Sequence, residues 1–252
     1  MQWNSPEHPE MTLTQGQTRP VNRIFCIAKN YEAHAREMGG EVDRAQPFHF
    51  QKSFDALSFG PAIHYPSHTE DLHHEVELVV VLGQGGRDVT PREAKDLVFG
   101  YACGIDFTRR DRQAEAKAQG RPWEMAKNFD DAAVLGVVAP VDEVGHLEAG
   151  AIQLSVNGAI RQQGDLNQMV YDVFELIAYV SRVQMLKPGD LIFTGTPSGV
   201  GAVERGDQLS VRSRACQNCQ CRWSTAAGLP SDARIFSQMP RNIGTAQMRF
   251  QR

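Results

Sequence analysis

The stretch His73–Gly83, HHEVELVVVLG, places two acidic residues in front of a run of leucine and valine. The valine-rich run, closed by Gly83, predicts a strand that is buried within a sheet. Side chains alternate along a strand, so Glu75 and Glu77 are expected to point the same way. Two carboxylates at that spacing repel each other in a buried setting, so one takes up a proton or a cation lies between them.

A solvent-facing pair at a strand edge is the plain alternative, because two acids one residue apart are a weak signal. Asp106 favours a metal site, since it closes the short apolar stretch YACGI, residues 101–105, where a buried acid is costly unless it is engaged. Mg²⁺ and Mn²⁺ prefer carboxylate oxygens. Three carboxylates, with the open positions filled by water or substrate, would form an oxygen-rich octahedral site.

A second group of residues lies in NYEAHAREMG, residues 30–39. On a helix, His34 and Glu37 are three residues apart and share one face. A carboxylate beside an imidazole orients the ring and raises its basicity, which suits a general base that acts on water. A surface pair worth a few tenths of a kcal/mol is the alternative interpretation.

A third candidate is the glycine-rich loop Thr194–Gly201, TGTPSGVG. Glycines let backbone N–H groups approach an anion closely, and threonine hydroxyls add donors. The stretch is not a P-loop, because the lysine that follows the second glycine of that motif is missing. An ordinary glycine-rich loop is equally compatible with the spacing.

Short strands and a few helices are expected along the rest of the chain, which predicts a mixed, β-rich α+β fold. Strands are predicted over 21–28, 47–52, 61–66, 101–108, 136–144, 151–164 with an Asn157-Gly158 turn, and 206–212. Helices are predicted over 30–40, 90–100 with Thr90 as N-cap and Gly100 as stop, 110–120 and 169–186. The last helix is expected to bury Val170, Val173, Phe174, Ile177, Val180 and Val183.

The composition excludes several classes of protein. The chain has 252 residues, 41% of them hydrophobic, and a net charge of −4, which gives no electrostatic footprint for nucleic acid. No apolar run approaches 18 residues, so no membrane span is predicted. The first residues lack the basic start and apolar core of a secretory signal, so a cytoplasmic location is expected. Cys26 and Cys103 lie in apolar surroundings and are expected to be small buried residues.

Several stretches, in this order along the chain, resemble the fumarylacetoacetate hydrolase superfamily, specifically its acylpyruvate and fumarylpyruvate hydrolase members. The resemblance runs from about Val21 to Val211. The stretches that carry it are NYEAHAREMG, HHEVELVVVLG, GYACGIDFTRRDRQ, GRPWEMAKNFD, SVNGAIRQQGD and LKPGDLIFTGTPSGVGAVERGD.

The resemblance implies a mixed β-sandwich roll of the type of that family's C-terminal domain, and usually a homodimer. It implies Mg²⁺ or Mn²⁺ as cofactor, a small 2-oxo acid as substrate, and a role for ten residues. These are Glu75, Glu77 and Asp106 as metal ligands, His34 and Glu37 as the base, Lys127 beside the developing charge, and Lys29, Arg110, Gln113 and Thr196 near the substrate. Lys29 stands where the family usually has arginine, and lysine lacks the bidentate fork, so its contact with a substrate carboxylate is left open.

The activity implied by the resemblance is hydrolysis of the carbon–carbon bond of an acylpyruvate, such as fumarylpyruvate or maleylpyruvate from aromatic-ring breakdown, to pyruvate and a carboxylic acid. Decarboxylation of oxaloacetate or a related 2-oxo diacid would use the same metal without attack by water. Isomerisation or hydration of a 2-oxo-enoate is a third possibility. A non-catalytic homologue is a fourth, against which the intact set of acids, histidine and lysine argues.

The resemblance divides the chain into an N-terminal arm of residues 1–20 expected to be loose, a catalytic domain of residues 21–211 and an atypical tail of residues 212–252. The tail contains C-x-x-C-x-C without a fourth metal ligand at suitable spacing. Codons for Arg212–Ser224 can be chosen so that the neighbouring frame reads FQGLPELSVPVV, a turn and a strand. We therefore expect a shifted reading frame, loss of the closing strand and an unpaired sheet edge.

Overall fold

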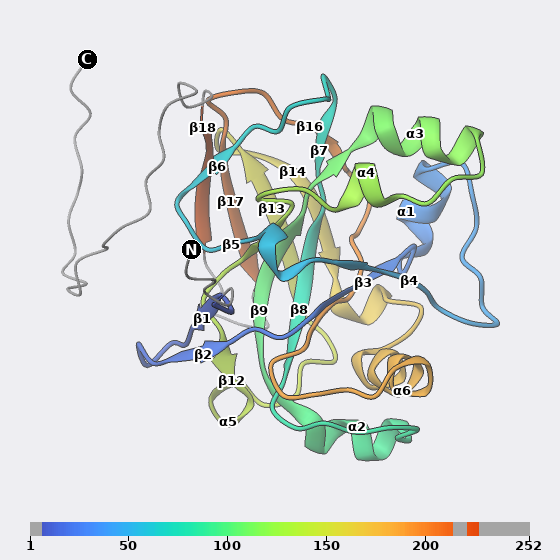
Figure 1. Ribbon diagram of the computed structural model, residues 1–252, viewed down its shortest axis with the longest axis vertical. Coiled ribbons are helices and arrows are strands. Elements are labelled where there is room, and N and C mark those ends of the chain that lie inside the picture. Colours follow the sequence, from blue (N-terminus) through green and yellow to red (C-terminus); the bar gives the residue numbers. More distant parts are fainter. Residues whose placement is uncertain (1–6, 214–220, 227–252) are drawn as a thin grey trace, which may run out of the picture.

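The computed structural model describes residues 7–213 and the backbone of residues 221–226. Its strands form four sheets, which Figure 1 shows with the helices arranged around them. The largest sheet has the order β4 (Phe48–Lys52), β3 (Ile24–Ala28), β15 (Leu191–Phe193), β8 (Val76–Leu82), β9 (Val98–Asp106), β11 (Ala133–Leu135) and β5 (Leu57–Ser58), with β12 (Ala139–Pro140) beside β9.

A five-stranded sheet packs against the largest one. Its order is β14 (Ala159–Asp165), β13 (Ala151–Val156), β17 (Gln208–Ser213), β18 (Cys221–Ala226) and β6 (Ala62–His64). The small sheets are β10 (Thr108–Arg109), β7 (Leu72–His74) and β16 (Gly201–Ala202), and the pair β1 (Glu10–Thr12) and β2 (Thr18–Pro20). Asn157 and Gly158 both have positive φ at the turn between β13 and β14, as a type I′ hairpin requires.

The helices are short. They are α1 (Glu32–Glu37), α2 (Pro91–Leu97), α3 (Arg110–Ala118), α4 (Glu124–Lys127), α5 (Val141–Val144) and α6 (Val173–Val183), with 3₁₀ turns at Phe54–Ala56 and Leu166–Gln168. Of these helices, only α2 and α6 begin at a residue whose side chain caps the helix. Thr90 and Asp172 form capping boxes with Glu93 and Glu175, which satisfy the first amides of α2 and α6. No helix among the described residues has the length and apolarity needed to cross a membrane.

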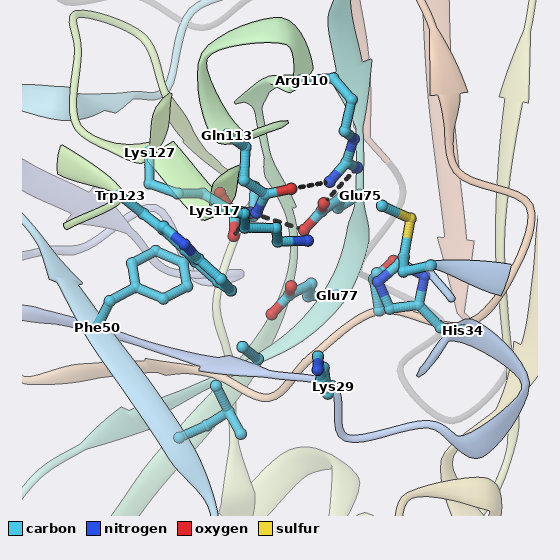
Figure 2. A pocket seen from close by; sticks show the side chains of 15 residues that line it. Lys29, His34, Phe50, Glu75, Glu77, Arg110, Gln113, Lys117, Trp123 and Lys127 are labelled. Atoms are coloured by element: carbon cyan, nitrogen blue, oxygen red, sulfur yellow. Dashed lines mark hydrogen bonds and ion pairs between the residues drawn. The ribbon is translucent and has the colours of Figure 1, made fainter. Parts of the chain in front are cut away.

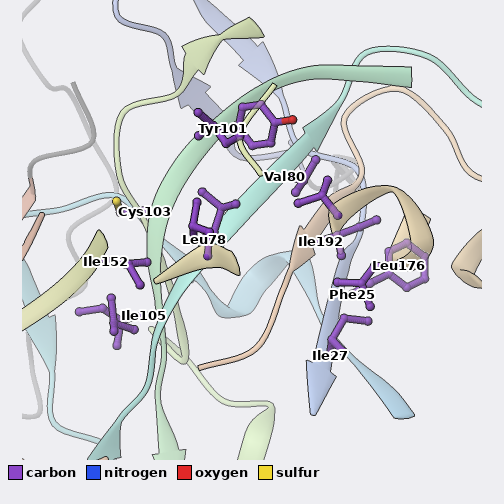
Figure 3. Close-up of a cluster of buried hydrophobic side chains, with 14 of the residues drawn as sticks. Phe25, Ile27, Leu78, Val80, Tyr101, Cys103, Ile105, Ile152, Leu176 and Ile192 are labelled. Atoms are coloured by element: carbon purple, nitrogen blue, oxygen red, sulfur yellow. The ribbon is translucent and has the colours of Figure 1, made fainter. Parts of the chain in front are cut away.

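Strand β8 is buried on both faces, which accounts for its unbroken apolar run. Leu78 and Val80 join the core between the two large sheets, where Figure 3 shows them near Tyr101 and Ile152. Val79 and Val81 face the opposite side, in a smaller core that Met11, Leu13, Ile24, Cys26 and Phe193 complete. Mixed sheets with a few packed helices confirm the predicted α+β class, and Cys26 and Cys103 are buried as expected.

Two of the predicted boundaries are wrong. Gly100 does not end the second helix, which stops at Leu97; it lies inside β9, where a Cβ would be 2.4 Å from the carbonyl oxygen of Ala139. The glycine is therefore needed for the close approach of β12. Residues 136–144 form only the two-residue β12 before helix α5, because Pro140 removes a ladder donor and acidic residues favour the first turn of a helix.

Three further expectations are corrected. Residues 10–20 are not a loose arm but form the β1–β2 hairpin, which buries Met11 and Leu13. The helix predicted over 169–186 is α6, which begins only at Val173, so Val170 precedes it. Val183, at the last position of α6, is 51% exposed and not buried as expected. The edge of β17 is paired, since β18 lies antiparallel to β17 and parallel to β6. The predicted change of reading frame falls largely on residues 214–220, which lie outside the described residues.

Candidate active site

The strand register brings the three predicted metal ligands together. In the β8–β9 ladder Val76 is opposite Ile105 and Glu77 is opposite Gly104, so Glu75 and Asp106 meet where the two strands part. The amide of Asp106 donates to the carbonyl oxygen of Glu75 at 2.8 Å. Carboxylate oxygens of Glu75, Glu77 and Asp106 lie within 4.8 Å of one another, and all three side chains are buried. The convergence expected from the sequence is therefore present.

Three cationic side chains surround this acidic cluster. Arg110 and Lys127 donate to the two carboxylate oxygens of Glu75 at 2.7 and 2.8 Å (Figure 2). Lys127 also donates to Asp106 at 2.8 Å, and Lys52 forms an ion pair with the other oxygen of Asp106 at 2.8 Å. Burial alone would raise the pKa of Glu75, but the charges of Lys127 and Arg110 outweigh it and hold that pKa well below its usual range.

Of the three carboxylates, Glu77 is the one whose negative charge is least compensated by neighbouring side chains. One of its oxygens accepts a hydrogen bond from the amide of Gly195 at 2.7 Å. Burial, together with the charges of Asp106 and Glu75, raises the pKa of Glu77 well above its ordinary value. A divalent cation would remove this repulsion, so the all-oxygen donor set and its electrostatics both fit Mg²⁺ or Mn²⁺.

Lys52 is a site residue that the sequence analysis did not identify. It ends β4, and its ammonium donates to the carbonyl oxygens of Phe107 at 3.2 Å, Ala132 at 3.0 Å and Lys127. The only signal in the sequence is the alternation along β4, which puts Lys52 on the same face as Phe50. These bonds fix the ammonium against Asp106 and hold the backbone at the end of α4.

The predicted dyad forms on α1. The Nδ1 atom of His34 is 3.1 Å from a carboxylate oxygen of Glu37, and the imidazole is buried, with 6% of the residue exposed. The other oxygen of Glu37 accepts from the amide of Gly199 at 2.9 Å. Asn30, just before α1, donates to the carbonyl oxygens of Thr194 and Tyr171 at 2.9 and 3.0 Å. The helix and the glycine-rich loop are thereby fixed to each other.

The glycine-rich loop binds carboxylates of the protein itself. Its amides at Gly195 and Gly199 donate to Glu77 and Glu37, so the loop orients one predicted metal ligand and one member of the dyad. Gly195 has φ of +96°, and a Cβ there would lie 2.8 Å from the side chain of Asn30. Only glycine can take this conformation without strain at such a distance.

Gln162 is a second buried residue that the sequence analysis missed. Its amide oxygen accepts from the backbone N–H of Val76, between the two glutamates, at 3.0 Å, and lies 2.8 Å from the imidazole of His74. Its amide nitrogen donates to the hydroxyl of Thr196 at 2.8 Å and to the carbonyl oxygen of Pro197 at 2.9 Å. The side chain therefore joins the strand of the acids to the glycine-rich loop. Because the Thr196 hydroxyl accepts this bond, its own proton is available to donate.

One cavity of about 410 Å³, including space open to solvent, collects the predicted site residues. Nine of the ten site residues predicted from the sequence line this cavity. The tenth, Glu37, does not line it but contacts the imidazole of His34. Phe50, Lys117 and Trp123 also line the cavity and were not assigned a role from the sequence.

The arrangement combines two chemical functions in one cavity that is open to solvent. A buried imidazole with a carboxylate partner can accept a proton from water. A cluster of three carboxylates beside Lys127 can hold a divalent cation next to a fixed ammonium. An anionic substrate with two adjacent oxygen atoms would fit between them.

Comparison with known proteins identifies the family of this chain. A sequence profile described as fumarylacetoacetate (FAA) hydrolase C-terminal matches residues 23–223. The mitochondrial oxaloacetate decarboxylase of Dictyostelium discoideum is 42% identical over 190 residues, which are 74% of this chain and 86% of that protein. Oxaloacetate tautomerase YcgM of Escherichia coli (strain K12) is 40% identical over 194 residues, which are 76% of this chain and 88% of that protein.

A solved structure shares the whole architecture. The fumarylpyruvate hydrolase of Pseudomonas aeruginosa, in complex with Mn²⁺ and pyruvate, superposes with a TM-score of 0.85 at 42% sequence identity. The superposition covers 90% of this chain and 100% of that one. The profile, the relatives and the structure lead to one conclusion: this chain is a member of the fumarylacetoacetate hydrolase family.

Proposed function

We propose that this protein is a metal-dependent hydrolase that cleaves an acylpyruvate to pyruvate and a carboxylic acid. The observation that carries the proposal is that the acidic cluster of Glu75, Glu77 and Asp106 and the dyad of His34 and Glu37 open onto one cavity. A 2,4-dioxo acid has a carboxylate and a 2-oxo oxygen at one end and an acyl carbonyl further along. The cavity offers separate groups for these two ends.

Glu75, Glu77 and Asp106 would hold the cation, with Mg²⁺ and Mn²⁺ as the candidates. When bound, such an ion acts as a Lewis acid toward the oxygens of a 2-oxo carboxylate. The related fumarylpyruvate hydrolase structure that contains Mn²⁺ and pyruvate supports this assignment. Lys127, Arg110 and Lys52 pair with Glu75 and Asp106, so an added dication would compensate Glu77 and leave positive charge for a substrate anion.

His34 would take a proton from water, and the resulting hydroxide would attack the acyl carbonyl. Glu37 holds the imidazole in orientation and stabilises its charge once the proton is accepted, and Gly199 fixes Glu37 in turn. This base catalysis is worth about 10²- to 10⁴-fold in rate.

Cleavage then breaks the bond between the acyl carbon and its neighbour. The electron pair passes to the pyruvate fragment, which leaves as an enolate and later takes a proton at carbon, while the hydroxide oxygen stays in the new carboxylic acid. Lys127, held at 2.8 Å from both Glu75 and Asp106, places a permanent positive charge beside the developing negative charge. Thr196 and Arg110 line the same cavity as hydrogen-bond donors for the substrate.

A reaction on oxaloacetate is the second candidate, favoured by the identity to an oxaloacetate decarboxylase and an oxaloacetate tautomerase. Decarboxylation would need the cation and Lys127 but no attack by water, and tautomerisation would need only proton transfer at carbon. The His34–Glu37 dyad, which serves to activate water, favours hydrolysis.

Product analysis separates these activities. The protein with Mg²⁺ or Mn²⁺ is given fumarylpyruvate, acetylpyruvate and oxaloacetate, and the products are identified by chromatography. Hydrolysis yields pyruvate and a second acid from the 2,4-dioxo acids, and decarboxylation yields carbon dioxide from oxaloacetate. Turnover of oxaloacetate alone would reject the hydrolase assignment. A homodimer and a cytoplasmic location are further proposals, testable by light scattering and cell fractionation.

A further inference from the structure

One face of α3 points into the active-site cavity. Arg110, Gln113 and Lys117 are three and then four residues apart, so they lie along a single stripe of the helix. Arg110 donates hydrogen bonds to Glu75 and, at 2.6 Å, to the side-chain oxygen of Gln113. Both Arg110 and Gln113 are therefore engaged in hydrogen bonds beside the acidic cluster. Lys117 lies a turn further along the helix, about 6 Å from Gln113 along the axis. The stripe therefore extends from Arg110, which contacts Glu75, to Lys117, which contacts Trp123.

Lys117 is held in place by packing. Its ammonium lies over the ring of Trp123, 5.2 Å from the centroid, and both residues line the cavity (Figure 2). A cation over the face of an aromatic ring is attracted by the negative potential of that face. Lys29 lines the same cavity, and its backbone adopts a positive φ of 57°. A non-glycine residue in that conformation is uncommon and often marks a functional site.

These two lysines lack the anionic partners that the other cavity cations have. Among the residues that the structure describes, Arg110, Lys127 and Lys52 each make an ion pair with the acidic cluster, and neither Lys29 nor Lys117 makes one with any carboxylate. Burial above all, and then the nearby charges of Arg110 and Lys29, lower the pKa of Lys117, while the charge of Glu75 acts in the opposite direction. Within the described part of the chain, the cavity thus has two ammonium groups that form no ion pair.

We propose that Lys117, with Lys29, binds a second carboxylate on the substrate, so that the site selects 2-oxo dicarboxylates over 2-oxo monocarboxylates. The proposal rests on the proposed binding of a 2-oxo acid at the acidic cluster and holds for hydrolysis or decarboxylation alike. One end of the substrate lies at Glu75, Glu77 and Asp106, and the far carboxylate extends along the α3 stripe to the ammonium of Lys117. A monocarboxylic acylpyruvate would leave the two lysines without a counter-ion.

Binding of two unreactive probes tests the subsite without turnover. The Mn²⁺-loaded protein is titrated calorimetrically with 2-oxoglutarate and with 2-oxopentanoate, which has the same chain length but a methyl group in place of the second carboxylate. We expect the wild type to prefer 2-oxoglutarate by about tenfold or more, the size of a charge-assisted hydrogen bond. Lys117→Met, which keeps an apolar stem against Trp123, should reduce the preference to below about threefold, and Lys117→Arg should keep most of it.

Arg112→Met is the matched control, because it removes the same charge from the same helix. Arg112 does not line the active-site cavity, and its side chain donates to the carbonyl oxygen of His68 at 2.8 Å. The Arg112→Met variant should therefore prefer 2-oxoglutarate over 2-oxopentanoate as strongly as the wild type does. Equal affinity of the wild type for the two probes, or a preference that Lys117→Met leaves unchanged, would overturn the subsite alone. Failure of both probes to bind to the Mn²⁺-loaded wild type would overturn the proposed function together with the subsite.

Discussion

Glu77→Gln should stabilise the metal-free protein while it abolishes stabilisation by metal. The substitution keeps the shape of the side chain and an oxygen that can accept from Gly195, but it removes one of three buried negative charges. At 4.8 Å and an effective dielectric constant near 20, each carboxylate neighbour repels Glu77 by roughly 3.5 kcal/mol. The ammonium groups of Lys127 and Lys52 offset part of this repulsion. We therefore expect a net gain of about 1–3 kcal/mol at neutral pH.

The stabilisation by Glu77→Gln should depend on pH, because it reflects the raised pKa of Glu77. The pKa of Glu77 is raised in the folded state above its ordinary value of 4.5, so the folded protein holds a proton that the unfolded chain has released. Stability contributed by this group is complete below pH 4.5 and is lost as pH rises through the folded pKa, by up to about 1.4 kcal/mol per pH unit. The advantage of Glu77→Gln over the wild type should therefore be small at pH 4.5 and should grow as the pH rises.

Thermal unfolding with EDTA and with excess Mn²⁺ measures both effects. Without metal, the variant should unfold roughly 2–10 °C above the wild type at pH 7. Mn²⁺ at about 100 times its dissociation constant should stabilise the wild type by roughly 2.7 kcal/mol and the variant hardly at all. Glu148→Gln, which neutralises an exposed carboxylate, is the control and should match the wild type in both conditions. A variant that is less stable without metal, yet stabilised by Mn²⁺ like the wild type, would refute the reasoning.

His34→Ala should reduce the rate of hydrolysis of a 2,4-dioxo acid by at least about 10²-fold and leave the affinity for Mn²⁺ unchanged. Steady-state kinetics measures the rate, and calorimetry measures the affinity. Near-normal turnover would reject His34 as the base. Lys52→Met should cost about 3–5 kcal/mol in the free energy of unfolding, measured with urea, because it removes one of the two buried ammonium groups that pair with Asp106 and leaves only Lys127. A cost below 1 kcal/mol would show that this ion pair is not needed. Gly100→Ala should cost about 1–3 kcal/mol in the same assay, since the added methyl group would meet the carbonyl of Ala139, and an unchanged midpoint would count against that close approach.

The parts of the structure that follow local patterns were predictable from the sequence. The buried strand after Glu77 follows from its valine run, and α6 follows from its apolar spacing, although its start at the Asp172 cap was predicted four residues too early. The meeting of Glu75 with Asp106 was implied by the resemblance to the family and favoured by the place of both acids at strand ends. Alternation along one strand alone says nothing about the register of the next.

Features that depend on distant partners were not predictable. Lys52 and Gln162 look like ordinary polar residues of short strands, but their partners are 34 to 88 residues away. Gly100 resembles a helix stop locally, and only the approach of Ala139 explains it. The first residues lack periodicity because their hairpin buries only Met11 and Leu13 against the smaller core.

The central claim is that three buried carboxylates from two neighbouring strands hold a divalent cation in the cavity that His34 lines. Anomalous diffraction from crystals grown with Mn²⁺ locates the ion directly. The account predicts one strong peak within coordination distance, about 2.0–2.3 Å, of oxygens from Glu75, Glu77 and Asp106. A peak that lies elsewhere on the protein, or an empty cluster at saturating Mn²⁺, would contradict it.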